Sequence, residues 1–515
     1  MKSASRVIKN TGFLYGKMVF TIFIALYSTR LILNALGKED YGVFTLVAGV
    51  ISMLSFINGA MIIATQRYLS ISLGAGDKER TKEVFSASVV LHLIIGVFIV
   101  IALEIAGLFI DKLNIPAESL GTAKTIFHFM VISTFFTINA VPYDASINSH
   151  ENMLFDAIAG VFEATMKLLI AVFLVYHDSN RLILYGLLIA SLTILIRVIK
   201  SIYCYRKYEE VRVKIKSHIN IGLLKEMVSF AGWNLFGLFC TVLKNQGLAL
   251  LLNLFFGIVV NAAYGVANQV NANIRAFSSN MLKALMPQIT KSEGSGDRQR
   301  MLRLAVFACK TSFFLLAFFS IPIIVEMPFV MKVWLKTVPE NAVVFCQLIL
   351  LLTMMYQITI GTMAAVTSVG KIKSFQIAVG ALEIFNLPLA FMLLKMGLPA
   401  YSVFIGSLFM ELIASGIRIW FAHKIAGLDI RDFVVNTWLR SIGAAAFTAL
   451  AAYIISLLLP QGFARAILVG ITTTLSIMLL LRFFVLSQFE IGKIREMAIA
   501  VYNKLRKKPL PAGTI

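Results

Sequence analysis

The chain has 515 residues, of which 59% are hydrophobic and only 14% are charged. Soluble globular domains carry about 25% charged residues, so this composition excludes an ordinary soluble protein and indicates a polytopic membrane protein. The formal net charge of +21 indicates positively charged loops that orient the chain in a membrane, rather than nucleic-acid binding.

Apolar segments long enough to cross a bilayer, about 20 residues each, recur along the whole chain. The sequence predicts fourteen of them, at residues 11–36, 42–66, 83–110, 120–148, 154–176, 182–205, 223–254, 258–287, 302–331, 342–368, 373–395, 399–423, 434–458 and 463–487. The first is too long for a signal-peptide core, so we expect an uncleaved first span. The expected fold is therefore an all-α polytopic membrane protein with about 14 transmembrane helices.

Basic residues cluster on alternate connections between these segments. If the N-terminus is cytoplasmic, the connections on that side include the basic stretches 78–82, 206–216 and 291–300 and the tail 488–515, whereas the opposite connections hold mostly one cation each. This asymmetry places both termini in the cytoplasm.

An internal duplication is visible at an offset of 220 residues. The matching pairs are Gly37 and Gly257, Gly74 and Gly294, Gly76 and Gly296, Asp77 and Asp297, and Arg80 and Arg300. Because six helices separate the copies, both copies begin on the same side of the membrane, as parallel repeats. The predicted divisions are an N-lobe with its basic linker at 1–222, a C-lobe at 223–433, an extra helix pair at 434–487 and a basic cytoplasmic tail at 488–515.

Cations inside membrane-length segments each cost about 2.5–3.5 kcal/mol on insertion scales, and four of them are least explained by a local partner or by a nearby helix end. They are Lys17, Arg30, Lys244 and Arg275. Such a cation usually faces a protein interior or a wet cavity. Lys17, nearer the expected cytoplasmic end, is predicted to be either an entrance contact or a lysine that reaches the membrane surface.

The seventh and eighth segments are also rich in amides. Those expected to line a cavity are Asn245, Gln246, Asn268, Gln269 and Asn271. Helices with so many polar groups cannot face lipid alone, so we expect a water-filled cavity between the two halves. Since the first, seventh and eighth segments carry no mid-span acid, the predicted ligand is an anion, with phosphate or diphosphate favoured by the bidentate donors of arginine.

Acidic residues inside the segments are the candidates for ion coupling: Asp144, Glu163, Glu383 and Glu411. The alternative is that the cations above are structural partners of Asp144, Glu383 or Glu411. Glu163 and Lys167 are four residues apart, which favours a local ion pair. Glu411 and Arg418 lie about 10 Å apart along one helix axis, so each is expected to find its partner elsewhere.

With these features the chain resembles the bacterial polysaccharide and O-antigen flippases of the multidrug/oligosaccharidyl-lipid/polysaccharide (MOP) exporter superfamily. The stretches that carry the resemblance are STRLILNALGKEDYGVFTLVAGV at 28–50, ATQRYLSISLGAGD at 64–77, FAGWNLFGLF at 230–239, LLNLFFGIVVNAAYGVANQV at 251–270 and MPQITKSEGSGD at 286–297.

The resemblance implies two six-helix lobes in a V, as in MATE transporters, and alternating access in the bacterial inner membrane. It implies an undecaprenyl-diphosphate-linked oligosaccharide as cargo, such as an O-antigen, capsule or exopolysaccharide repeat unit. A polysaccharide polymerase, other glycan-assembly proteins and membrane lipids are the implied partners. In the related lipid II flippases, cavity arginines engage the diphosphate and helices 13 and 14 form a groove for the polyprenyl tail.

Two other functions fit the sequence less well. A MATE-type drug/cation antiporter needs intramembrane carboxylates, but the first segment has none. A glycan polymerase or ligase would be expected to carry a long outer loop with catalytic residues, and no outer connection is long enough. The chain also lacks a P-loop pattern, and we expect no enzyme activity, cofactor or metal.

Overall fold

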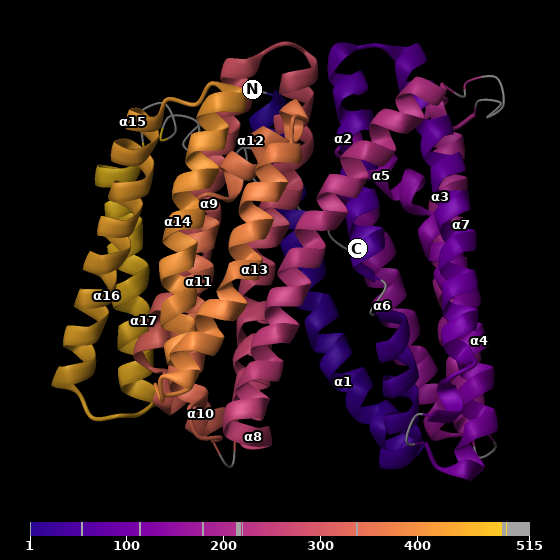
Figure 1. Cartoon of the computed structure of the whole chain (residues 1–515), viewed down its shortest axis with the longest axis horizontal. Coiled ribbons are helices and arrows are strands. Elements are labelled where there is room, and N and C mark those ends of the chain that lie inside the picture. The colour runs from indigo at the N-terminus through magenta and orange to yellow at the C-terminus, as the bar shows by residue number, and fades with distance from the viewer. Residues whose placement is uncertain are drawn as a thin grey trace, which may run out of the picture. The chain divides into compact units, whose positions relative to one another are not determined.

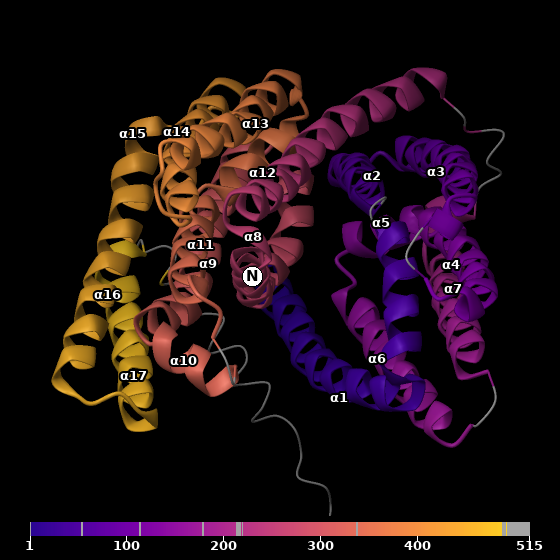
Figure 2. The same ribbon diagram turned by 60° about the horizontal axis from the view of Figure 1, so that its bottom comes forward.

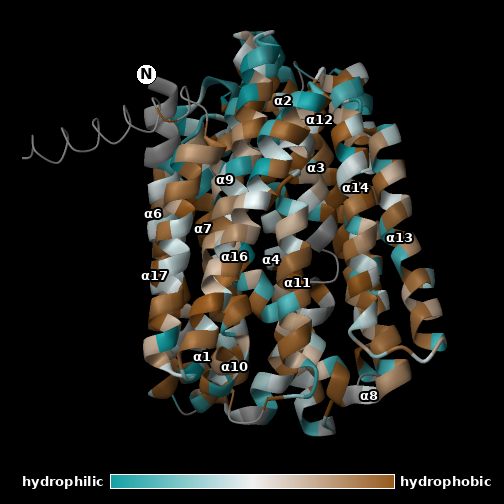
Figure 3. Ribbon diagram, turned by 90° about the vertical axis from the view of Figure 1, so that its left-hand side faces the viewer, coloured by the Kyte–Doolittle hydropathy of each residue, from teal (hydrophilic) through white to brown (hydrophobic). Residues whose placement is uncertain are grey.

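In a computed structural model of the chain, the described residues are 2–52, 55–112, 115–177, 180–212, 218, 220–335, 338–486 and 491. The long elements in this part are all helices, which confirms the all-α class. The expected basic tail at 488–515 lies outside the described residues, except for residue 491. Figure 3 shows apolar residues along the lengths of the helices and hydrophilic residues gathered near the helix ends, as expected for a membrane protein.

Eleven described helices are long and apolar enough to cross a membrane, and one bent helix pair makes a possible twelfth. The expected count of about 14 is therefore not confirmed. The two expected spans that do not qualify are 42–66 and 258–287. The first is divided between two helices around residues 53 and 54, which are not described, and the second is helical but carries many amides and two cations.

The chain divides into two compact units, which we describe separately. Unit 2 comprises Gly12–Leu238 and Thr290–Gly296. Its long helices are α1 (Lys2–Ser52), α2 (Ser55–Ala75), α3 (Lys78–Gly107), α4 (Leu120–Asn139), α5 (Val141–Ser149), α6 (Met153–Val175), α7 (Arg181–Lys207) and the two ends of α8 (Ile221–Gly294). Helix α4 packs against both α3 and α7 (Figures 1 and 2), around a core that includes Phe127 and Ile126.

Unit 1 comprises Met1–Thr11, Phe239–Ile289 and Asp297–Ile515. Its helices after α8 are α9 (Arg298–Val325), α10 (Met327–Trp334), α11 (Ala342–Gln357), α12 (Ile360–Val369), α13 (Lys373–Lys395), α14 (Ser402–Ala426), α15 (Ile430–Phe433), α16 (Arg440–Leu458) and α17 (Phe463–Leu480). Helices α16 and α17 lie side by side (Figure 1) and both pack against α9. A π-helical segment precedes α16 (Val434–Leu439) and another follows α17 (Leu481–Val485).

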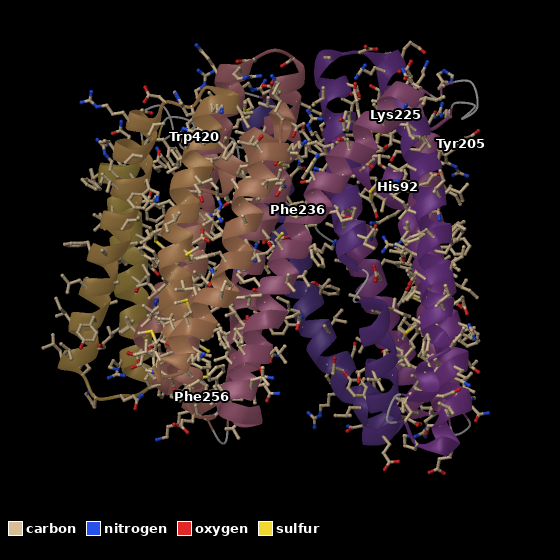
Figure 4. All side chains as sticks on the ribbon, in the orientation of Figure 1. His92, Tyr205, Lys225, Phe236, Phe256 and Trp420 are labelled. Carbon is tan, nitrogen blue, oxygen red and sulfur yellow. The ribbon has the colours of Figure 1, made fainter. Side chains whose placement is uncertain are left out.

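Two of the repeated glycines mark breaks inside the longest helices. Gly37 interrupts α1 with φ 80° and ψ 173°, and Gly257 interrupts α8 with φ 79° and ψ −172°. This backbone region is essentially reserved for glycine. Figure 4 labels Phe256, which precedes the break, at the turn of α8. The two breaks separate the first and second spans of each predicted repeat in the same way.

The next repeated residues end one helix and start another. Gly76 and Gly296 have φ values of 72° and 77°. The following residues, Asp77 and Asp297, cap α3 and α9 by accepting hydrogen bonds from the third amide of each helix at 2.9 and 3.0 Å. A carboxylate at this position satisfies an otherwise unpaired amide. The duplicated aspartates therefore cap the N-terminus of corresponding helices in the two predicted repeats.

Candidate functional site

The predicted cation Lys244 forms an ion pair with Glu383. Lys244 lies on α8 and Glu383 on α13, and both side chains are largely buried, at 14% and 12% exposed. This contact corresponds to the alternative in which a cation is the structural partner of Glu383. An acid from another helix thus neutralises the charge of Lys244, and its role in binding an anion stays a prediction.

Glu411 and Arg418 on α14 bind each other directly, which corrects the expectation that each needs a partner elsewhere. Their guanidinium and carboxylate make two contacts, of which the Nη2–Oε2 distance is 3.3 Å. Helical side chains lean toward the N-terminus of their helix, so the long Arg418 side chain reaches back over two turns to Glu411. Thr359 also accepts a hydrogen bond from Arg418, at 3.2 Å.

A single aromatic ring connects this buried pair to the predicted cation Arg275. The guanidinium carbon of Arg418 lies 4.7 Å from the ring centroid of Tyr356, and that of Arg275 lies 5.2 Å from the same centroid. Arg418 is fully buried, whereas Arg275 is exposed. Within the described residues, Arg275 forms no ion pair. The cluster around Tyr356 therefore has two cations, Arg275 and Arg418, against the carboxylate of Glu411, and the exposed Arg275 carries the excess charge.

The predicted amides do not all lie in one environment. Asn245, Gln246, Asn268 and Gln269 are exposed on α8. Asn271 is partly buried, and its side-chain oxygen accepts a hydrogen bond of 2.8 Å from Thr353 on α11. Asn271 therefore helps to attach α8 to α11, while the other four present polar groups at the helix surface near Lys244 and Arg275 in the sequence.

In unit 2, the predicted cation Lys17 belongs to a chain of alternating charges. Its Nζ lies 3.1 Å from Asp156 Oδ2 on α6. Lys200 on α7 lies between two acids, 3.4 Å from Asp156 Oδ1 and 2.7 Å from Asp144 Oδ1. Arg197 closes the series at 3.2 Å from Asp144 Oδ2. This network, which we call the unit 2 ladder, has three cations and two carboxylates.

Arg30 differs from these residues because its side chain is exposed on α1 and forms no ion pair with any residue that the structure describes. Lys17 is on the same helix but is neutralised by Asp156. Of the four predicted anion ligands, Arg30 and Arg275 are thus the two whose charge stays available.

The four candidate ion-coupling acids all have basic partners. Glu163 accepts a hydrogen bond of 2.7 Å from Lys167, which confirms the predicted local pair. Asp144 contacts Lys200 and Arg197, and the partners of the other two acids, Glu383 and Glu411, are Lys244 and Arg418. A carboxylate engaged in this way is poorly placed to take up a coupling cation.

Sequence reasoning missed three residues of these clusters. Asp156 and Lys200 lie near helix ends, where charged residues are ordinary, and Tyr356 is one aromatic residue among many. A search for partners of Asp144 could have found Lys200, which shares a face of α7 with Arg197 three residues earlier. Nothing in the sequence singles out Tyr356.

An apolar groove lies between α9 and α17 in unit 1. Its volume is about 410 Å³ and its lining residues are Phe318, Phe319, Pro322, Ile323, Ile467, Gly470, Ile471, Thr474 and Leu475. Thr474 is the single hydroxyl in this set, and that hydroxyl is bonded to the carbonyl of Gly470. The groove therefore presents hydrocarbon to any occupant.

Comparison with known proteins supports the fold more strongly than the function. No family model matches the chain. The uncharacterized membrane protein EpsK of Bacillus subtilis (strain 168) is 23% identical over 310 residues, which are 58% of this chain and 59% of EpsK. The match thus spans little more than half of that relative.

Solved structures of transporters resemble most of the chain. A mutant MATE superposes with a TM-score of 0.71 at 14% identity, covering 84% of this chain and 99% of that one. A MOP-superfamily transporter from Pyrococcus furiosus, whose binding pocket of reverse polarity is described as suggesting a different function, gives 0.67 at 13% identity, with 84% and 99% covered. The chain therefore has the fold of the MATE and MOP transporters.

Proposed function

We propose that the protein is a flippase that moves an undecaprenyl-diphosphate-linked oligosaccharide from the inner to the outer leaflet by alternating access. The observation that carries this proposal is the state of Arg275, an exposed guanidinium held near the ring of Tyr356 without an acidic partner among the described residues. Arginine offers paired donors that match phosphate oxygens. Arg30 in unit 2 has the same unpaired character.

The acids argue against the alternative, a drug/cation antiporter. Such a transporter needs carboxylates that can exchange a proton or sodium ion for an organic cation, and the four candidates are bound to lysine or arginine side chains. This fold is compatible with more than one kind of pocket, because the similar transporter from Pyrococcus furiosus has a binding pocket of reverse polarity.

The groove between α9 and α17 supports a lipid as cargo. Its apolar lining suits an isoprenoid chain, which exchanges the hydrocarbon of the bilayer for the hydrocarbon of the groove. The resemblance to lipid II flippases implies a polyprenyl groove formed by the last two helices, here α16 and α17. The observed groove shares α17 with that expectation, but its other wall is α9. The expected cavity between the two halves stays a prediction.

The cargo's own charge can supply direction. A diphosphate carries about two negative charges, and an inside-negative potential of 100 mV favours outward movement of each by about 2.3 kcal/mol. The proposal thus requires neither ATP nor a coupled ion, and it assigns no enzymatic step to the protein.

Arginine substitutions in the intact cell test the proposal. We expect Arg275→Ala and Arg30→Ala to abolish surface glycan while protein level and membrane insertion stay unchanged, and Arg→Lys at either position to restore it in part, because lysine lacks the bidentate fork. Arg303→Ala is the matched control, since Arg303 is an exposed arginine on α9. Full surface glycan in both Ala variants would refute the anion-binding role.

Deletion of the gene identifies the cargo. We expect an oligosaccharide linked to undecaprenyl diphosphate to accumulate in the inner leaflet, where mass spectrometry of extracted lipids can detect it. An unchanged pool of lipid-linked sugars would contradict the flippase assignment.

A further inference from the structure

Asp156 divides its charge between two lysines that come from different helices. Its Oδ2 faces Lys17 of α1 at 3.1 Å and its Oδ1 faces Lys200 of α7 at 3.4 Å. Lys200 is also held by Asp144 at 2.7 Å. If Lys17 moves away, Asp156 therefore keeps a cationic partner that is fixed in place.

The position of Asp156 in α6 further lowers the free-energy cost of separating Asp156 from Lys17. Asp156 lies in the first turn of α6, whose N-cap is Asn152. Unpaired amides and the helix dipole favour a negative charge at this end of a helix. Loss of one lysine thus does not leave a buried charge without compensation.

Lys17 is the most exposed member of the ladder. Its side chain is 26% exposed, compared with 22% for Arg197 at the other end, 9% for Asp156 and 10% for Lys200. The stem of Lys17 lies against Gly160, one turn after Asp156, where an added Cβ would be only 2.1 Å from the Cε of Lys17. The missing side chain at Gly160 gives Lys17 its path to Asp156.

We propose that Asp156 is an exchangeable counter-ion for Lys17, and that an anionic diphosphate head group takes its place. This inference rests on the proposed function and adds a first contact for the cargo. On binding, the ammonium of Lys17 turns from Asp156 to the phosphate oxygens, and Lys200 retains Asp156. The ion pair with Asp156 thereby neutralises Lys17 until a ligand of higher charge density, the diphosphate, replaces Asp156.

Binding of undecaprenyl diphosphate to the purified full-length protein in detergent tests this proposal. Asp156→Asn should bind this probe about two- to fivefold more tightly than the unaltered protein, because it removes a competing carboxylate. Lys17→Gln should bind at least about tenfold more weakly, since a charge-assisted hydrogen bond is lost. The double variant should bind like Lys17→Gln, because the gain from Asp156→Asn requires Lys17.

The remaining variants separate exchange from a purely structural pair. Gly160→Ala, which keeps both charges but pushes Lys17 from its path, should also bind more tightly. Asp111→Asn is the matched control, because Asp111 pairs with Lys124 at 2.7 Å on the surface of unit 2; its affinity should not change.

The outcomes also distinguish this inference from the function on which it rests. If the wild-type protein binds the probe and Asp156→Asn binds it no more tightly, the counter-ion exchange is overturned but the proposed flippase function is not. If Asp156→Asn fails to fold, unchanged affinity of Lys17→Gln overturns the exchange instead. Absence of binding by the wild-type protein would overturn both proposals.

Discussion

Gly74 and Gly294 meet at a helix crossing in which each contacts the backbone beside the other. A Cβ on Gly74 would lie 2.3 Å from the carbonyl oxygen of Lys291, and a Cβ on Gly294 would lie 2.3 Å from that of Ile71. Ile71 and Lys291 are themselves separated by the offset of the duplication. Within unit 2, the end of α2 and the end of α8 thus cross with local twofold symmetry, and each glycine is required by the other helix.

We expect Gly74→Ala and Gly294→Ala to destabilise the protein by about 1–3 kcal/mol each, the usual cost of overpacking, because backbone atoms cannot give way as a side chain does. The measurement is thermal unfolding of the purified protein in detergent. Gly232→Ala is the control, since a Cβ there meets nothing within 4 Å. A helical glycine in open space should gain about 0.5–1 kcal/mol on becoming alanine. Equal unfolding temperatures for all three variants would contradict the crossing.

The breaks in α1 and α8 give a second prediction. Gly37→Ala and Gly257→Ala should each cost about 1–3 kcal/mol, because neither backbone conformation suits a residue with a Cβ. No atoms crowd either glycine, so the cost comes from the backbone alone and should be similar at both positions. Gly265→Ala, at an uncrowded position inside α8, is the control in the same unfolding assay. A large difference between Gly37→Ala and Gly257→Ala would show that the two breaks are not equivalent.

Much of the fold was predictable because it depends on local signals. Apolar length predicts most spans, and the offset between Gly37 and Gly257 predicts two equivalent breaks, which the structure places at nearly identical backbone angles. The count of spans is not confirmed where polarity interferes, as in the second half of α8. There, the helix around Asn268 is long enough to cross a membrane, but its many amides make it too polar to qualify as a span by hydropathy.

The candidate site was less predictable because ion pairs join residues that are far apart in the sequence. Lys244 and Glu383 are on different helices, and only the fold brings them together. The pair of Glu411 and Arg418 was missed for a different reason. Axial distance suggested separation, whereas the length of the Arg418 side chain and its lean toward the N-terminus of α14 decide the contact.

That buried pair supports a prediction about ion coupling. Arg418 is 0% exposed and Glu411 8%, so Glu411→Gln should leave an uncompensated guanidinium and cost about 3–5 kcal/mol. We expect a reduced protein level in membranes, measured by immunoblot. Replacing both residues by apolar ones, Glu411→Leu with Arg418→Met, should recover much of that loss. A normal level of Glu411→Gln combined with lost transport would instead indicate that Glu411 binds a coupling ion.

Lys244 and Glu383 allow a test of whether a cation inside the membrane serves the ligand or the fold. Lys244→Met alone should lower the protein level, because Glu383 then loses its partner in a largely buried position and breaking a buried pair costs about 3–5 kcal/mol. Since each residue neutralises the other, the double variant Lys244→Met with Glu383→Met should restore both the protein level and surface glycan, with Arg275 still supplying the accessible charge. Immunoblotting and glycan staining measure the two quantities on the same cells. A restored protein level without surface glycan would show that Lys244 also contacts the cargo.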